Sequence, residues 1–261
     1  CDSGTKFNVY HMSTAPNNIA LKKRLDRYFW ANNTGEMQFL RRLLDEHFAE
    51  FDRVAVIGGL VRDFAYEGRS SFHSDIDLVI DAPQERIAQL ATILNATPNR
   101  FGGFCSKQGH WKIDFWALET TWARKHVPIE SLEDIVSCTF FDWDAVAYDL
   151  KKRKLICAKN YLSQIRNRTL DINLLPNPSP LGNLVRAVRR LMIWKVQPGP
   201  RLRQFIHEHL DDSALRFIQT KELELYTYAV STRWKTAYEA KRAIFSISRR
   251  KNDPQPELSL D

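Results

Sequence analysis

Asp75 and Asp77 stand one residue apart in the run SDIDLVI, which is otherwise mostly apolar. In a β-strand, residues i and i+2 point to the same face, so the two carboxylates project together while Ile76 and Leu78 face the core. Two carboxylates at this spacing repel each other unless a cation lies between them. A hard divalent ion such as Mg²⁺ takes oxygen ligands, so the spacing indicates a metal site.

A third acid, Asp114, lies in the β-rich run HWKIDFWAL. If that strand lies beside 74–80, three carboxylates converge. Such a cluster could hold two metal ions for an in-line phosphoryl displacement. If Asp114 instead faces the core, Asp142 and Asp144 are the next candidates for the third acid.

A glycine pair, Gly58-Gly59, ends the apolar run VAVI shortly before these acids. Glycine lets the backbone approach a ligand closely, and a helix that begins there would aim N–H groups at a triphosphate. Arg62 would add positive charge. A glycine pair or a D-x-D motif alone is weak evidence, but the order strand, glycine pair, helix and acidic strand is much more specific.

This order of motifs resembles the nucleotidyltransferase superfamily that includes DNA polymerase β. More narrowly, GGLVRDF followed by SDIDLVI is similar to the tRNA CCA-adding enzyme and bacterial poly(A) polymerase family, whose head domain carries G-G-x-V-R-D and then D-x-D. DAVAYDL at 144–150 resembles the family's N-A-L-A-Y-D segment. LVRAVRRL at 184–191 resembles the L-R-A-x-R-F helix of the family's neck.

The resemblance implies an α/β (α+β) nucleotidyltransferase head with a mixed sheet, followed by an all-helical C-terminal part. It implies a Mg²⁺-dependent enzyme, with two ions, that transfers a nucleoside monophosphate from an NTP to a hydroxyl acceptor and releases pyrophosphate. The acceptor it implies is an RNA (tRNA-like) 3′ end. The catalytic and metal-binding residues are then Asp75, Asp77 and, from the strand argument and the superfamily pattern, Asp114. The implied nucleotide-binding residues are Gly58, Gly59, Arg62, Asp63, Ser74, Asp144, Arg186 and Arg189.

The sequence departs from the family where an R-R-D motif would contact the nucleotide. Those places read Cys138, Thr139 and Phe140, and the family's Asn is Asp144. Base and ribose selection could therefore differ. Two alternatives stay open: a nucleotidyltransferase that acts on a small molecule or protein, and a catalytically inactive nucleotide- or RNA-binding regulator.

Hydrophobic periodicity predicts the elements that would position these residues. Helices are expected at 21–29, 37–51, 83–95 and 181–196, and β-hairpins around Gln108-Gly109 and around 151–153. The expected division of the chain is an added leader at 1–11 before a natural start at Met12, a head at 12–158, a neck-like helical domain at 159–248 and a disordered tail at 249–261.

The composition is that of an ordinary globular protein, with 44% hydrophobic and 26% charged residues. The net charge of +7 favours a polyanionic partner such as RNA or a nucleotide. Four widely spaced cysteines suit reduced thiols in a cytoplasmic protein and argue against a cysteine zinc site. No run approaches the length of a membrane span, so no membrane partner is expected. The oligomeric state stays open.

Overall fold

The computed structural model describes residues 14–68 and 75–247. The expectations for the leader, for Ser74 and for the tail lie outside these ranges. The helices are α1 (Asn18–Asp26), α2 (Gly35–His47), α3 (Gly59–Tyr66), α4 (Gln84–Ile93), α5 (Tyr161–Arg166), α6 (Pro180–Trp194), α7 (Pro200–His209), α8 (Asp212–Leu225) and α9 (Ala237–Phe245), with a π-helical segment at Arg27–Ala31. The strands are β1 (Val54–Ile57), β2 (Ile76–Ile80), β3 (Thr97–Pro98), β4 (Phe104–Gln108), β5 (Trp111–Ala117), β6 (Val146–Asp149), β7 (Lys154–Cys157), β8 (Thr169–Leu170) and β9 (Gln197–Pro198).

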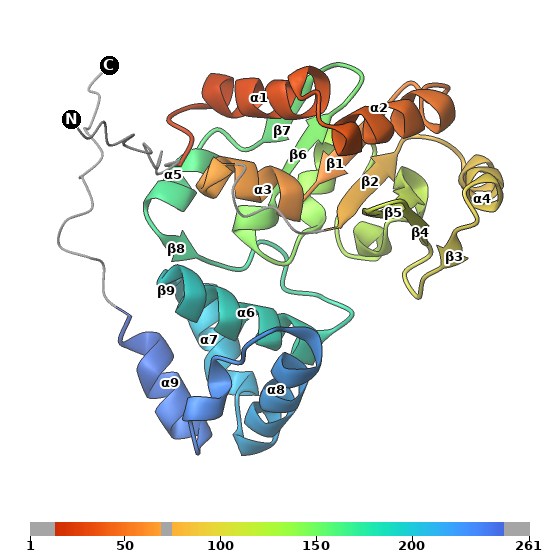
Figure 1. The fold of residues 1–261 in the computed structure, drawn as a ribbon. Coiled ribbons are helices and arrows are strands. Elements are labelled where there is room, and N and C mark those ends of the chain that lie inside the picture. The colour runs from red at the N-terminus through yellow and green to blue at the C-terminus, as the bar shows by residue number, and fades with distance from the viewer. Residues whose placement is uncertain (1–13, 69–74, 248–261) are drawn as a thin grey trace, which may run out of the picture.

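A mixed seven-stranded sheet with the order β3-β4-β5-β2-β1-β6-β7 forms the head. Its pairs are antiparallel except for β2 and β5, which are parallel. The parallel pair follows from the connection between the two strands, which runs through α4 and then doubles back in the β4–β5 hairpin. Helices α1 and α2 lie along the sheet, with α3 beside them (Figure 1).

The two faces of the sheet pack against different apolar clusters. On β2, Ile76, Leu78 and Ile80 belong to the main hydrophobic core, which the N-terminal helices cover. On the opposite face, Ala55, Ile57 and Val79 pack against a smaller apolar cluster from the segment 118–138. This alternation leaves the N-terminal end of β2 free to present acids on the second face.

Helices α6 to α9 form a separate lobe in space, below the head in Figure 1. Helix α6 begins with Pro180 in its first turn and buries Leu184, Val188 and Leu191 at helical spacing. Its buried side chains belong to the same hydrophobic core as the head. The lobe is therefore packed on the head and not merely tethered to it.

Most expected elements form where periodicity places them, with three differences. The helix expected at 21–29 divides into α1 and the π-helical segment Arg27–Ala31. The chain also forms strands after residue 158: the short strands β8 and β9 pair with each other between the head and the helical lobe. Helix α5 lies in the range expected for the neck-like domain, but it packs on the head, where the Tyr161 hydroxyl donates a hydrogen bond to the Trp143 carbonyl. No helix within the described ranges is both long and apolar enough to span a membrane.

Candidate active site

Asp77 of β2 lies directly beside Asp114 of β5 in the parallel register. Ile113 and Phe115, the neighbours of Asp114, are buried in the main core, so Asp114 points to the opposite face together with Asp77. Local sequence explains the arrangement, because both strands alternate polar and apolar residues at this point. The structure thus places two of the three acids that the sequence singles out side by side on adjacent strands.

Asp75 lies just before β2 and is engaged by a lysine. The ammonium group of Lys112 donates a hydrogen bond to an Asp75 carboxylate oxygen and lies 3.6 Å from Asp114 Oδ2. Lys112 stands two residues before Asp114 on β5, so both side chains leave the strand on the same face. A protein cation therefore already lies between two of the three acids.

The environment of Asp77 fits a divalent cation. Burial, followed by the neighbouring charges of Asp114 and Asp75, raises the pKa of Asp77 to about 7. A cation bound between Asp77 and Asp114 would relieve this repulsion, and two carboxylates complemented by phosphate oxygens and water are a common Mg²⁺ ligand set. Within the described residues, however, no group of three or more acidic, histidine or cysteine side chains is arranged to hold a metal. Asp77 and Asp114, which lie in register, therefore suit a metal ion as a pair of ligands.

The glycine pair stands where the sequence argument requires a close backbone approach. Val56 pairs with Leu78, so Gly58 follows β1 at the end of β2 that carries Asp77. Gly58 has a φ of 72° and is the N-cap of α3, a backbone conformation that favours glycine. It offers no side-chain cap to the first turn of α3, whose leading N–H groups have no intrahelical acceptor.

Arg62 and Asp63 lie on α3 in a buried ion network. Arg62 contacts Asp63 at 2.7 Å and Asp144 Oδ1 at 2.6 Å. The second oxygen of Asp144 pairs with Arg190 of α6, also at 2.6 Å. Burial alone would raise the pKa of Asp144, but the guanidinium groups of Arg190 and Arg62 override it and hold the pKa at about 2. The network joins the head to the helical lobe.

The two arginines of α6 that the resemblance selects lie in different surroundings. Arg186 is exposed and lines the same cavity as Asp77 and Asp114. Arg189 is buried, pairs with Glu222 of α8 at 2.8 Å and donates to the Tyr228 carbonyl. Arg189 therefore ties α6 to α8 within the helical lobe and is not among the residues that line the cavity.

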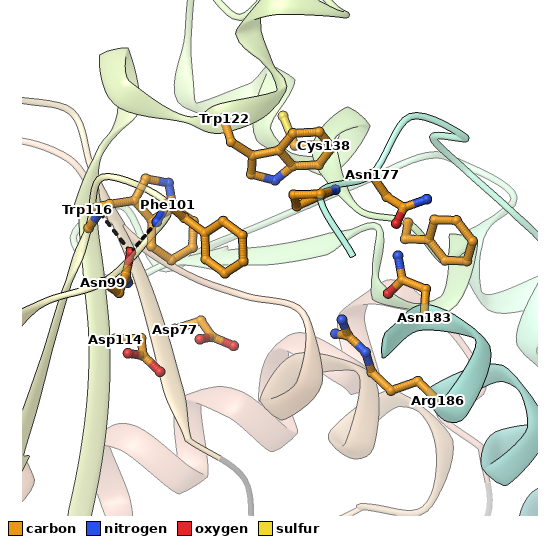
Figure 2. A pocket seen from close by; sticks show the side chains of 13 residues that line it. Asp77, Asn99, Phe101, Asp114, Trp116, Trp122, Cys138, Asn177, Asn183 and Arg186 are labelled. Atoms are coloured by element: carbon orange, nitrogen blue, oxygen red, sulfur yellow. Dashed lines mark hydrogen bonds between the residues drawn. The ribbon is translucent and has the colours of Figure 1, made fainter. Parts of the chain in front are cut away.

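A cavity of about 410 Å³ opens between the acidic face of the sheet and α6. Figure 2 shows Asp77 and Asp114 at one side of it, Arg186 and Asn183 at the other, and the rings of Phe101, Trp116 and Trp122 above the acids. It is lined by Asp77, Asn99, Phe101, Gly103, Asp114, Trp116, Trp122, Cys138, Phe140, Asn177, Pro178, Asn183 and Arg186. Its size lies within the roughly 300–1,000 Å³ typical of small-molecule sites.

The amide side chains of the cavity differ in how they are used. Asn99 accepts hydrogen bonds from the backbone of Phe101 and Gly103, and Asn177 accepts one from the Ser179 backbone, so both shape their own loops. Asn183 is 3% exposed, and no described residue forms a hydrogen bond with its side-chain amide. The Asn183 amide is directed toward the cavity (Figure 2) and is available to a ligand.

Sequence reasoning missed most of these lining residues. Asn99, Phe101, Trp122 and Asn177 come from loops and short helical turns, where no periodic pattern marks a residue as facing a site. Of two neighbouring aromatic residues on β5, Trp116 lines the cavity while Phe115 is buried in the core. Alternation along β5 was the available signal, since Trp116 follows Asp114 by two residues.

These features define the fold of a nucleotidyltransferase head followed by a helical region, as the sequence predicted. No protein-family model matches the sequence, and no curated protein matches it. Solved structures do match. A CCA-adding enzyme in complex with ATP is 19% identical, with a TM-score of 0.55, over 85% of this chain and 53% of that chain.

Two further solved structures show the same similarity. A Thermotoga maritima CCA-adding enzyme complexed with tRNA is 18% identical over 86% of this chain and 53% of its own, with a TM-score of 0.55. A tRNA-processing enzyme in an apo form is 17% identical over 82% and 57%, with a TM-score of 0.52. The chain thus resembles this family in fold and spans about half the length of these structures.

Proposed function

We propose that this protein is a nucleotidyltransferase that transfers a nucleoside monophosphate from an NTP to a hydroxyl acceptor. The observation that carries the proposal is the placement of Asp77 beside Asp114 at the wall of a cavity that an arginine and several aromatic rings complete. Paired acids, a basic side chain and stacking surfaces are the groups that metal-assisted phosphoryl transfer to or from a nucleotide needs.

The cavity supplies the binding surface for the nucleotide. The rings of Phe101, Trp122 and Phe140 offer faces on which a base can stack, and Asn183 offers a donor and an acceptor for its polar edge. Arg186 would contact ribose or phosphate oxygens. The open N-terminus of α3 after Gly58 would donate N–H groups to the triphosphate, since helix N-termini attract anions.

The reaction forms a bond between the acceptor oxygen and the α-phosphorus. It breaks the bond from that phosphorus to the oxygen that bridges to the β-phosphate, so pyrophosphate leaves. Asp77 and Asp114 would hold Mg²⁺, which supplies charge neutralisation for the phosphates. Asp114 would accept the proton of the attacking hydroxyl, as a carboxylate within reach of that hydroxyl can do.

The ion network of Asp144 would position the groups that bind the nucleotide without contacting the nucleotide itself. Because Asp144 binds Arg62 of α3 and Arg190 of α6 at once, it fixes the helix that carries Arg186 relative to the strand that carries Asp77. Arg62 is fully engaged with Asp144 and Asp63 in this state. We therefore assign Arg62, Asp63 and Asp144 to positioning, in place of the direct nucleotide contacts that the resemblance implies.

We further propose an RNA 3′ end as the acceptor. The net charge of +7 supports a polyanionic partner, and one of the structures with this fold is a complex with tRNA. The test is to incubate the protein and Mg²⁺ with each α-labelled NTP, in one arm with total RNA and in the other with an RNA-free pool of small hydroxyl compounds. Label in the RNA supports the proposal. Label only in small products makes the acceptor a small molecule, and no label transfer with any NTP contradicts the enzymatic function.

A further inference from the structure

Lys112 has a position in the acidic cluster that its sequence neighbours do not explain. Asp77 pairs with Asp114 in the parallel register, so the residues two places earlier, Asp75 and Lys112, also face each other where β2 and β5 begin. The Lys112 ammonium donates to Asp75 and lies 3.6 Å from Asp114 Oδ2. The strand pairing that assembles the acids also places this cation among them.

The contact is poorly suited to a stabilising role. The side chains of Lys112 and Asp75 are 51% and 43% exposed, and ion pairs at such exposure contribute little to folding stability. The Asp114 side chain, at 24% exposed, is more enclosed, so the Lys112 charge acts where solvent screening is weaker. The main effect of Lys112 is therefore to reduce the net negative charge of the three acids.

The charge balance limits how many cations the cluster attracts. Three ionised carboxylates carry three negative charges, and the ammonium group cancels one of them. The remaining two are matched by a single divalent ion between Asp77 and Asp114. Asp75 is drawn toward Lys112, which agrees with the lack of a three-acid metal site among the described residues.

We propose that Lys112 is a built-in cation of the active site that occupies the place of a second divalent ion, so that the nucleotide complex takes one metal ion where two were expected from the acids alone. The inference rests on the proposed function. Lys112 acts by its fixed positive charge on Asp75 and Asp114, and Asp77 with Asp114 provides the ligands for the one ion.

The test counts bound Mn²⁺ by electron paramagnetic resonance in complexes of the full chain with the α,β-methylene analogues of the four NTPs. Nucleotide binding is followed separately by equilibrium dialysis. We expect one Mn²⁺ per complex for the parent and two for Lys112→Met, whose cluster has lost its own cation. Lys112→Arg keeps the charge and should stay at one. Lys125→Met, which removes an exposed lysine from a 3₁₀ turn, is the matched control and should also stay at one.

Each other result has a defined meaning. Two ions in the parent complex, or one ion in the Lys112→Met complex, overturns the role of Lys112 and leaves the nucleotidyltransferase proposal standing. If none of the four analogues binds the parent at saturating Mn²⁺, the proposed function fails, and the inference fails with it. Because Lys112 is half exposed, Lys112→Met should fold, and its circular dichroism spectrum and melting temperature verify that.

Discussion

Asp144 binds Arg190 of α6 through one carboxylate oxygen and Arg62 of α3 through the other, with both contacts at 2.6 Å. Arg62 lies 82 residues from Asp144 within the head, and Arg190 lies 46 residues from it in the helical lobe, so the Arg190 pair bridges the two parts. A carboxylate in this position links stability to pH, because its charge is what holds the two arginines.

The first prediction concerns acid stability. The pKa of Asp144 is about 2 in the folded protein and near 3.9 in an unfolded chain, so its contribution is present above about pH 4 and is lost as the pH falls toward 2. We expect Asp144→Asn to lower the free energy of unfolding by about 3 kcal/mol at pH 7, because the buried Arg190 loses its carboxylate partner and Arg62 loses one of its two. In urea titrations this difference should shrink between pH 4 and pH 2.

The exposed Asp81→Asn is the control for the loss of a carboxylate. If Asp144→Asn is as stable as the parent at pH 7, the link between the head and the helical lobe does not rest on this carboxylate.

A second prediction concerns the apo protein. Burial and two neighbouring carboxylates raise the pKa of Asp77 to about 7, so ionising Asp77 costs folding free energy that grows from about pH 4 and is complete above pH 7. Asp77→Asn should therefore raise the free energy of unfolding at pH 8 in the presence of EDTA, by up to about 4 kcal/mol for a pKa raised by about three. At pH 4 the two proteins should be equally stable. A destabilised Asp77→Asn at pH 8 would refute the repulsion argument.

A third prediction concerns the cavity. If a base stacks on Trp122, Trp122→Ala should weaken NTP binding by about 1–3 kcal/mol, the range found when a stacking aromatic is removed. Equilibrium dialysis gives the dissociation constants. Tyr238→Ala removes a ring that is 74% exposed in the helical lobe and should leave them unchanged. Equal affinities for the parent and Trp122→Ala would place the base elsewhere.

The fourth prediction concerns RNA. Arg186 is exposed at the cavity, whereas Arg189 and Arg190 are held by Glu222 and Asp144. Arg186→Ala should therefore reduce the slope of log K against log salt by about 1 and weaken different RNAs alike. Arg216→Ala, an exposed change on α8, serves as the control. No detectable RNA binding at low salt would count against an RNA acceptor.

The residues that sequence could identify are those with a local pattern. Asp77 lies on β2 with Asp75 directly before that strand, and Asp114 alternates with core residues on β5, so a period of two was enough to predict their faces. The helix at α6 and the two hairpins follow from the same periodicity and from turn residues.

The rest depended on contacts between distant segments. Nothing in the spacing of Arg62 and Asp144 indicates that they meet, and the resemblance suggested nucleotide contacts for both. Arg189 and Arg190 are adjacent in sequence, yet they bind Glu222 and Asp144 in different parts of the molecule. Lys112 could be read only as an alternating strand residue until the pairing of β2 with β5 was known.

The central claim is that Asp77 and Asp114 carry nucleotidyl transfer. Its most direct test is the rate at which label from α-labelled NTPs enters acceptor in the presence of Mg²⁺, compared for the parent, Asp77→Asn and Asp114→Asn, with Asp81→Asn as control. The account predicts transfer by the parent and by Asp81→Asn, and a loss of at least about 100-fold in each of the other two, on the scale of removing a charge-stabilising group from an active site. Transfer at the parental rate by the folded Asp77→Asn variant would contradict it.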